Sequence, residues 1–214
     1  MALEIFIVRH AQSQGNVDGL FIGHTDVPLS ALGEKQAEVL CQYLSNFEID
    51  EIYSSDLKRA VQTITPIARR LNLEIKTDKG LREINGGDWE KVRFDEICSL
   101  FPDDYKLYGI DPVNSRPTNG ESILEVAFRV KGAVDKIVQN TNAKRIVVCS
   151  HATSIRGLDC LLSDGTMDNW NNIPYVSNAS VTIFEYADGK YKLVKRNIDD
   201  FMGDLITKLP SEVR

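Results

Sequence analysis

The chain has 214 residues, of which 43% are hydrophobic and 26% are charged, a composition typical of a globular protein with a sizeable core. This length predicts a single domain over residues 1–214. The net charge of −6 argues against a nucleic-acid partner, and the absence of a long apolar stretch argues against a membrane partner.

The beginning of the chain lacks the basic segment and apolar core of a signal peptide, so we expect a cytoplasmic protein. No CxxC pair occurs, and we expect reduced thiols at all four cysteines, Cys41, Cys98, Cys149 and Cys160. A zinc site needs clustered His, Cys and carboxylate ligands, which a chain with three histidines does not suggest. We therefore expect neither a metal nor a cofactor.

The first half of the chain predicts strands that alternate with helices. Residues 3–9 are apolar without alternation, which is typical of a strand buried on both faces. Ser30 is expected to cap a helix with apolar side chains at helical spacing. Residues 51–55 predict a short strand, and Asp56 is expected to cap the next helix, which Pro66 should kink or restart.

The second half continues this alternation. Residues 73–77 predict a strand, and the irregular stretch 85–118 predicts a helical excursion over the sheet. A helix follows Glu121, residues 144–149 predict another strand, and a helix begins at about Thr153.

Two alternating strands at the end of the sequence flank the dipeptide Asp188-Gly189, which favours a two-residue hairpin turn. The whole pattern predicts an α/β fold. Its architecture is a three-layer α/β/α sandwich on a mostly parallel central sheet, with an antiparallel edge hairpin and a helical cap insertion.

This fold brings polar residues to one edge of the sheet. Ligands of open α/β sheets bind outside the carboxyl ends of the strands, and Arg9, His10 and His151 lie at such ends. Arg59 follows in the first turn of a helix. Two histidines and two arginines around one crevice suit a phosphate dianion, because arginine presents a fork of donors to its oxygens.

The chain is similar to the histidine phosphatase superfamily, also called phosphoglycerate mutase-like. Six blocks occur in the family's order from residue 5 to about residue 156. They read VRHAQSQGN, GHTDVPLSALGEKQA, YSSDLKRAVQT, LREINGGDWE, PTNGES and VVCSHATSIR. The resemblance implies one histidine phosphatase domain, with a cap region at about 85–118 that forms most of the outer wall of the pocket.

Three residues depart from the family's pattern. Ala11 and Ala152 replace the glycines that usually follow each histidine, and Lys91 replaces the glycine after Trp-Glu. We expect the two added methyl groups to reshape the floor of the pocket, which affects the choice of substrate rather than the chemistry.

The resemblance implies a role for each matched residue. His10 is the expected nucleophile and forms a phosphohistidine, while its other ring nitrogen donates to a backbone carbonyl. Glu83 protonates the leaving oxygen and then takes a proton from water. The phosphate oxygens are held by the remaining members of the set, namely Arg9, Arg59, His151, Asn16 and the N–H of Ala152.

Other residues near the motifs have simpler interpretations. Trp89 is expected to pack at the base of the cap, and His24 to lie in a surface loop. Arg82 and Arg156 lie near the site, where solvated or structural roles compete with binding. A cysteine phosphatase is excluded, because six residues rather than five separate Cys149 from Arg156.

The sequence favours a metal-independent phosphatase that hydrolyses a small phosphate monoester. Two alternatives stay open: phosphoryl transfer of the phosphoglycerate mutase type, and a regulatory role that binds phosphoproteins or hydrolyses phosphohistidine. The physiological substrate and the oligomeric state are not fixed by the sequence, and a homodimer is among the alternatives.

Overall fold

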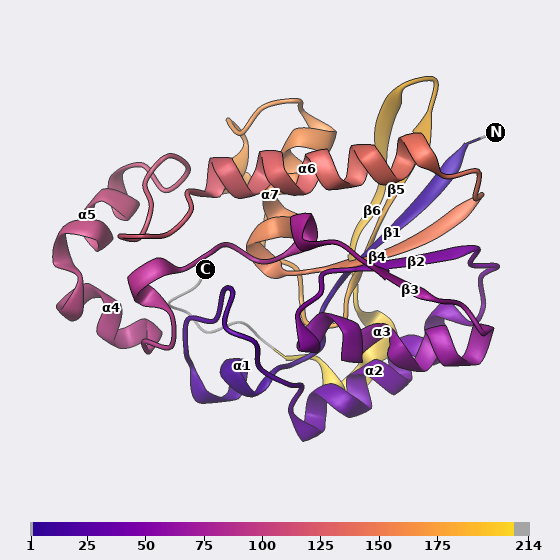
Figure 1. Cartoon of the computed structure of the whole chain (residues 1–214), viewed down its shortest axis with the longest axis horizontal. Helices are drawn as coiled ribbons and strands as arrows, with labels where there is room; N and C mark the ends of the chain where they lie inside the picture. Colours follow the sequence, from indigo (N-terminus) through magenta and orange to yellow (C-terminus); the bar gives the residue numbers. More distant parts are fainter. Residues whose placement is uncertain (1, 208–214) are drawn as a thin grey trace.

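The computed structural model describes residues 2–207 and contains one six-stranded sheet in the order β3-β2-β4-β1-β5-β6 (Figure 1). The first four strands along the sheet are mutually parallel, and β5 and β6 are antiparallel. The strands are β1 (Leu3–Arg9), β2 (Glu51–Ser54), β3 (Ile75–Thr77), β4 (Arg145–Ser150), β5 (Val181–Ala187) and β6 (Lys190–Ile198). The predicted fold class, including the antiparallel edge hairpin, is confirmed.

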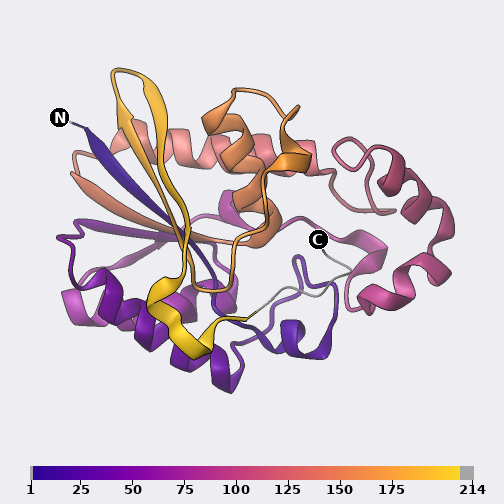
Figure 2. The ribbon, with the colours of Figure 1, turned by 180° about the vertical axis from the view of Figure 1, so that it is seen from behind.

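Helices cover both faces of the sheet (Figures 1 and 2). Helices α2 (Ala31–Leu44) and α3 (Lys58–Leu71) pack on one face, and α6 (Ile123–Asn140) and α7 (Ala152–Ser163) pack on the other. Side chains of β1 alternate between the two cores. Ile5 and Ile7 face α6 and α7, whereas Phe6 and Val8 face α2 and α3. Burial on both faces explains the unbroken apolar run that predicted this strand.

The remaining helices lie mainly beyond the carboxyl ends of the strands. Within 85–118 the chain forms helices, as predicted, but they extend past the end of the sheet rather than over its face (Figure 1). The helices of this part are α4 (Phe94–Leu100), α5 (Pro102–Ile110) and the 3₁₀ turn η2 (Gly87–Trp89). Elsewhere the chain forms α1 (Gln14–Asp18), η1 (Lys79–Leu81), η3 (Trp170–Asn172) and η4 (Asp200–Leu205).

The starts of the helices test the predicted caps. Ser30 caps α2, because its hydroxyl accepts the N–H of Gly33 at 3.0 Å. The predicted cap at Asp56 is wrong, since both of its carboxylate oxygens bind Arg82 at 2.6 Å. Instead Asp26, which is distant in sequence, accepts the N–H of Lys58 at 2.8 Å. A local pattern cannot distinguish a cap from an ion pair with a remote partner.

Two other details of the helices differ slightly from prediction. Helix α3 runs without a restart through Pro66. Helix α7 begins at Ala152, one residue before the predicted start. Helix α6 follows Glu121 as predicted, and a capping box of Ser122 and Glu125 starts it.

The hairpin of β5 and β6 is confirmed in detail. Asp188 and Gly189 have φ values of 52° and 77°, the left-handed conformation that a type I′ turn requires at both positions.

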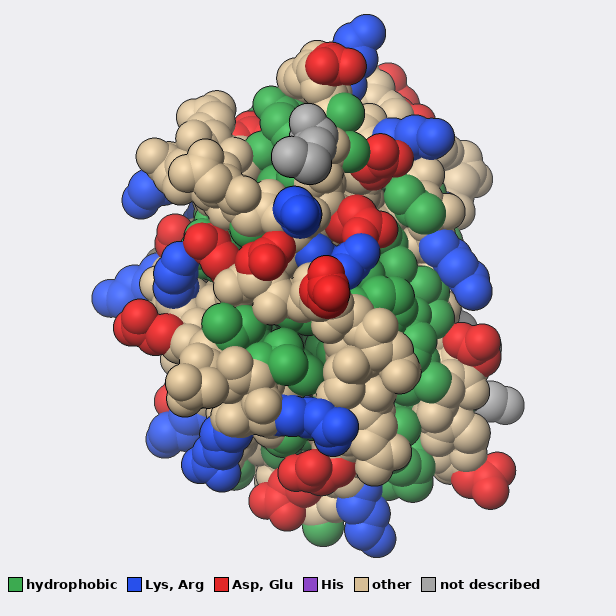
Figure 3. All heavy atoms as spheres, turned by 90° about the vertical axis from the view of Figure 1, so that its right-hand side faces the viewer, with side chains coloured by type: hydrophobic (Ala, Val, Ile, Leu, Met, Phe, Trp, Pro, Cys, Tyr) green, Lys and Arg blue, Asp and Glu red, His purple; other side chains and the backbone are tan. Residues whose placement is uncertain are grey.

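On the face at the amino ends of the strands, basic and acidic side chains are interspersed (Figure 3). Within residues 2–207, no helix is long and apolar enough to cross a membrane.

Candidate active site

The carboxyl ends of β1, β2 and β4 lie side by side and border a cavity of about 840 Å³. His151 does not line this cavity; its fully buried ring lies next to that of His10, with 5.1 Å between the centroids. The other predicted site residues all line the cavity: Arg9, His10, Asn16, Arg59, Glu83 and Ala152. Segments far apart in the sequence therefore converge as predicted.

His10 is held firmly at the end of β1. Its backbone N–H donates to the carbonyl of Ser150 at 3.0 Å, and its own carbonyl accepts from the side chain of Asn178 at 3.0 Å. The ring nitrogen Nδ1 lies 2.7 Å from the carbonyl oxygen of Ala11. Because a carbonyl only accepts, Nδ1 must carry the proton, and Nε2 is left with a free lone pair. This is the ring arrangement that the sequence predicted.

The charge state of His10 follows from its surroundings. Burial, with smaller contributions from the positive charges of Arg59 and Arg9, holds the pKa of His10 well below its ordinary value of 6.5. The hydrogen bond with Ala11 acts in the opposite direction but is a smaller effect. The ring is therefore neutral at physiological pH, and Nε2 remains unprotonated.

His151 precedes the first turn of α7 and is fully buried. Neither of its ring nitrogens has a hydrogen-bond partner among the described residues. Burial first, and then the charge of Arg59, holds its pKa well below 6.5 as well. Buried polar atoms are nearly always paired, so the two unpaired ring nitrogens of His151 indicate that a ligand bound next to His10 forms a hydrogen bond with this ring.

Arg9 and Arg59 supply positive charge beside His10. Arg9 donates from Nη1 to the carbonyl of Val176 at 2.6 Å, and its buried Nε has no partner among residues 2–207. Arg59 donates to the carbonyls of Gly23 at 2.7 Å and Thr25 at 3.0 Å. Burial lowers the pKa of each to about 10, so both remain cationic at neutral pH.

The loop that holds Arg59 is anchored by Glu90, a role that sequence reasoning missed. The carboxylate of Glu90 accepts backbone N–H bonds from Gly23, His24 and Thr25 at 3.2, 2.7 and 3.1 Å, and another from Gly86 at 3.0 Å. A side chain at residue 23 would overlap the carbonyl oxygen of Ile84, so only glycine fits there. Glu90 thus fixes the two carbonyls that orient Arg59.

The carboxylate of Glu83 lies at the amino end of α7. Its oxygens accept the backbone N–H groups of Thr153 at 3.1 Å and Ser154 at 3.2 Å, and Oε1 also accepts from Ile84 at 2.9 Å. The side chain lines the cavity, whereas Asp88 and Glu90 from the same sequence block do not. Glu83 is therefore the acid of this block that can reach a ligand.

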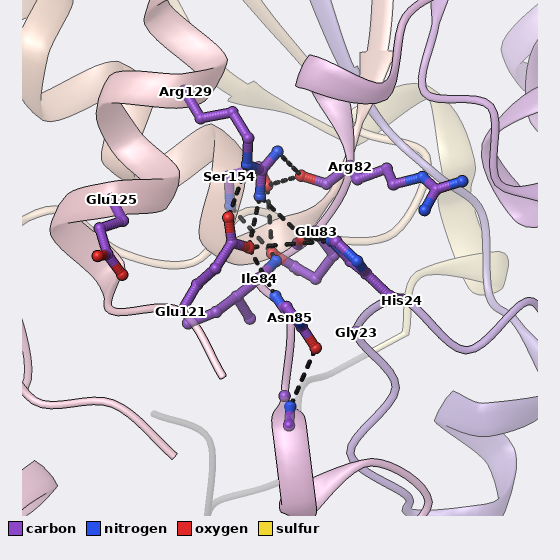
Figure 4. Close-up of polar contacts among 12 residues, drawn as sticks. Gly23, His24, Arg82, Glu83, Ile84, Asn85, Glu121, Glu125, Arg129 and Ser154 are labelled. Atoms are coloured by element: carbon purple, nitrogen blue, oxygen red, sulfur yellow. Dashed lines mark hydrogen bonds and ion pairs between the residues drawn. The ribbon is translucent and has the colours of Figure 1, made fainter. Parts of the chain in front are cut away.

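The backbone on both sides of Glu83 is clamped by Arg129 of α6 and by Glu121, which precedes that helix (Figure 4). Arg129 forms a paired contact with Glu121 and donates to the carbonyls of Arg82 at 3.0 Å and Glu83 at 3.1 Å. Glu121 in turn accepts the N–H of Asn85 at 2.8 Å. His24, placed by the sequence in a surface loop, is half-buried and also donates to the carbonyl of Glu83 at 3.0 Å.

Two further predicted donors, Asn16 and Ala152, also line the cavity. Asn16 uses its carbonyl oxygen to accept the N–H of Ser13 at 3.0 Å, which completes the capping box of α1. Its amide nitrogen donates no hydrogen bond within the described part of the chain. Ala152 is the first helical residue of α7, where a backbone N–H has no partner within the helix. Both groups are therefore available to an anion.

Aromatic side chains form part of the cavity wall, some of them from the predicted cap region 85–118. Trp89 packs edge-on against Phe21 and Tyr108, with centroid distances of 5.7 and 5.8 Å, and all three line the cavity. Arg156 contributes a guanidinium group next to Trp170 on the same wall. Arg82, in contrast, forms an ion pair with Asp56.

The four cysteines are free thiols, and Cys41, Cys149 and Cys160 are buried. Over residues 2–207, no group of three or more His, Cys, Asp or Glu side chains is placed to hold one metal ion.

Comparison with known proteins identifies the family. The sequence profile of the histidine phosphatase superfamily (branch 1) matches residues 5–199. The chain belongs to this superfamily. The resemblance carried by the six sequence blocks is thereby confirmed.

Related histidine phosphatases cover nearly the whole chain. Phosphoserine phosphatase 1 of Hydrogenobacter thermophilus is 31% identical over 94% of this chain and 95% of its own length. Phosphoglycerate mutase-like protein 4 of Arabidopsis thaliana is 33% identical over 87% and 80%, respectively. Among solved structures, Bacillus stearothermophilus YhfR superposes with a TM-score of 0.88 at 28% identity, covering 94% of this chain and 99% of that one. A mycobacterial glucosyl-3-phosphoglycerate phosphatase superposes with a TM-score of 0.83 at 27% identity, covering 93% and 100%.

The departures from the pattern of the histidine phosphatases have distinct structural consequences. Ala11 is fully buried in the core beneath α2 and α3 and does not line the cavity, so its expected effect on the pocket floor is wrong. Ala152 does line the cavity. Lys91 has a φ of 65°, which explains why glycine is usual at this position.

Proposed function

We propose that this histidine phosphatase hydrolyses small phosphate monoesters through a covalent bond between phosphorus and Nε2 of His10. The hydrogen bond between Nδ1 of His10 and the carbonyl of Ala11 is the observation that carries the proposal. It fixes the tautomer, and the buried surroundings keep the ring neutral, so Nε2 has a nucleophilic lone pair available for a phosphate that binds beside it.

In the first step, Nε2 attacks phosphorus and the bond to the leaving oxygen breaks. Arg9 and Arg59 hold the equatorial phosphate oxygens, with His151, the amide of Asn16 and the N–H of Ala152 as further donors. For this role the ring of His151 must carry a proton on the nitrogen that faces the phosphate. The negative charge of a bound phosphate dianion favours protonation of this ring, which burial otherwise disfavours.

Glu83 completes the first step by giving its proton to the leaving oxygen, which departs as a neutral alcohol. In the second step a water molecule attacks phosphorus, and Glu83 takes the water's proton. The bond from phosphorus to Nε2 breaks, inorganic phosphate is released, and His10 returns to its neutral form. Splitting the reaction into two displacements lets one carboxyl group act first as acid and then as base.

Phosphoryl transfer to a second organic acceptor would share the first step and differ only in what attacks the phosphohistidine. Some relatives carry mutase names, such as the probable phosphoglycerate mutase of Yersinia enterocolitica. Hydrolysis is favoured because the LREINGGDWE block around Glu83 resembles the phosphatase branch. Release of inorganic phosphate in the absence of any organic acceptor separates the two reactions.

The decisive experiment traps the intermediate. Protein mixed with an aryl phosphate labelled on phosphorus and quenched within milliseconds should carry label that is stable in alkali and labile in acid, as phosphorus bound to nitrogen is. His10→Ala should carry none and should lose nearly all turnover. His24→Gln is the matched control, because His24 lies outside the cavity and a glutamine amide can still donate to the carbonyl of Glu83. Labelling should therefore persist at His10. Labelled His10→Ala protein would overturn the proposal.

A further inference from the structure

Arg156 lies in a corner of two aromatic rings on the cavity wall. Its guanidinium carbon is 4.0 Å from the centroid of Trp170 and 4.4 Å from that of Tyr175, and the two rings are perpendicular, with 6.1 Å between their centroids. Such a stack fixes the plane of the guanidinium group while preserving its charge. One nitrogen, Nη2, donates to the carbonyl of Trp170 at 2.7 Å, and Nε has no partner within residues 2–207.

Arg156 also lacks a carboxylate partner among the described residues. In this it resembles Arg9 and Arg59, the two other arginines that line the cavity. Most arginines outside the cavity form an ion pair with an acid: Arg82, Arg93, Arg116, Arg129, Arg145 and Arg196. These three guanidinium groups share the cavity with the carboxylate of Glu83, whose negative charge acts on Arg9 and Arg59. Once Glu83 carries a proton as general acid, the three groups indicate a ligand with more negative charge than a phosphate dianion alone.

The number of guanidinium groups sets how much negative charge the ligand needs. When Glu83 is protonated to act as general acid, the three guanidinium groups are balanced by a phosphate dianion together with one further monoanion. A carboxylate is the monoanion that best matches the planar fork of an arginine. The second anion would therefore belong to the leaving group of the substrate.

Helix geometry sets the separation of the two anions. Ala152 and Arg156 are four residues apart on α7, so they lie on one face of the helix and about 6 Å apart along its axis. The N–H of Ala152 is a proposed donor to the phosphate, and helical side chains lean toward the amino end of their helix. A spacer of a few atoms can thus connect a phosphate at His10 with a carboxylate at Arg156.

One loop holds both ends of this arrangement. Tyr175 packs on Arg156, the carbonyl of the next residue, Val176, accepts from Arg9, and the side chain of Asn178 donates to the carbonyl of His10. The rings of Trp89 and Tyr108 line the same cavity. A flat apolar spacer would stack on these rings, because ring faces and edges prefer such contacts.

We infer that Arg156, Trp170 and Tyr175 form a carboxylate-binding subsite, and that the preferred substrates are phosphate monoesters whose leaving group contains a flat apolar part and a carboxylate. The inference rests on the proposed hydrolysis at His10 and adds the class of leaving group to it.

The test compares two esters that differ in one charge. Carboxybenzyl phosphate and carbamoylbenzyl phosphate have nearly the same shape, and each is used as its 3- and 4-isomer. Wild-type protein should show a kcat/KM that is about 10–100-fold higher for the carboxylate in at least one isomer, the usual scale for a hydrogen-bonded charge pair. In Arg156→Gln this ratio should fall below about 3, and Arg156→Lys should lie between. Arg69→Gln, an exposed arginine of α3, is the control and should retain the wild-type ratio.

The outcomes separate a failure of the carboxylate subsite from a failure of the proposed hydrolysis at His10. If wild-type protein hydrolyses the charged and neutral esters of both isomers equally well, the subsite is overturned while hydrolysis at His10 stands. If neither ester is hydrolysed and no phosphohistidine forms, the proposed function itself fails. Competition by inorganic phosphate measures the inner site separately. A loss of phosphate binding in Arg156→Gln as large as the loss of the ratio would make Arg156 a structural residue and overturn the inference.

Discussion

The imidazole rings of His10 and His151 lie 5.1 Å apart between centroids and are tilted by 58° to each other. Both are buried beside the positive charges of Arg59 and Arg9, which is why the pKa of each is held well below 6.5. The folded protein therefore keeps two neutral histidines under conditions in which the unfolded chain protonates them.

This pair makes stability depend on pH. Below about pH 6.5 and down to the lower pKa values of the folded state, the unfolded chain binds more protons than the folded one. The free energy of unfolding should then fall as the pH falls, by up to about 1.4 kcal/mol per pH unit for each histidine. Urea denaturation between pH 7.5 and 5 measures this slope, and His151→Gln should flatten it. Equal slopes in the two proteins would contradict the pKa shift of His151.

Glu83 as general acid should matter most when the leaving oxygen is basic. Glu83→Gln is expected to slow hydrolysis of an alkyl phosphate about 10²–10⁴-fold. The burst of nitrophenolate from an aryl phosphate should slow much less, because that phenolate leaves without a proton. Asp88→Asn is the control, since Asp88 contacts Asn119 and does not line the cavity. Equal losses for alkyl and aryl bursts would mean that Glu83 only positions the phosphate.

Glu90 should act through the loop that orients Arg59. In Glu90→Gln, an amide N–H would face the backbone N–H groups of Gly23, His24 and Thr25, and the charge that strengthens these bonds would be lost. We expect a loss of about 1.5–3 kcal/mol in the free energy of unfolding. Weaker competition by inorganic phosphate should accompany it, because Gly23 and Thr25 hold Arg59. Unchanged phosphate competition would show that the loop does not position this arginine.

The convergence of His10, Arg59 and His151 could be predicted because the carboxyl ends of parallel strands must meet at one edge of a sheet. The protonation of Nδ1 could be expected for a related reason, since a strand end offers nearby backbone carbonyls. In both cases the chemistry depends on local sequence and on a topology that the alternation of strands and helices already indicates.

Other features depend on contacts between distant segments. The position of Glu83 is set by Arg129 on α6 and by Glu121 just before that helix, which clamp an otherwise irregular stretch. The cap of α3 comes from Asp26 rather than from the adjacent Asp56. Arg156 gains its aromatic partners from η3 and from the loop that follows it, neither of which has a periodic sequence. No local pattern encodes these pairings, so only the three-dimensional structure could supply them.

The backbone at Lys91 gives a prediction about stability. Its φ of 65° is left-handed, a conformation that costs a residue with a side chain about 1–2 kcal/mol relative to glycine. The turn persists because the N–H of Lys91 donates to the carbonyl of Phe21 at 2.9 Å, while the N–H of Phe21 donates to Val92 at 2.8 Å. Glycine would relieve the strain, although it would also make the unfolded chain more flexible.

The net effect of Lys91→Gly should be a gain of about 0.5–1 kcal/mol in the free energy of unfolding, seen as a higher urea midpoint with an unchanged slope. Lys35→Gly provides the matched control, because Lys35 is also exposed but lies in helix α2. There the same substitution should cost about 1 kcal/mol. If Lys91→Gly raises the free energy of unfolding and Lys35→Gly lowers it, the difference comes from the backbone conformation, since both variants lose the same side chain and the same charge. A loss of stability in both would mean that the turn at Lys91 is not strained.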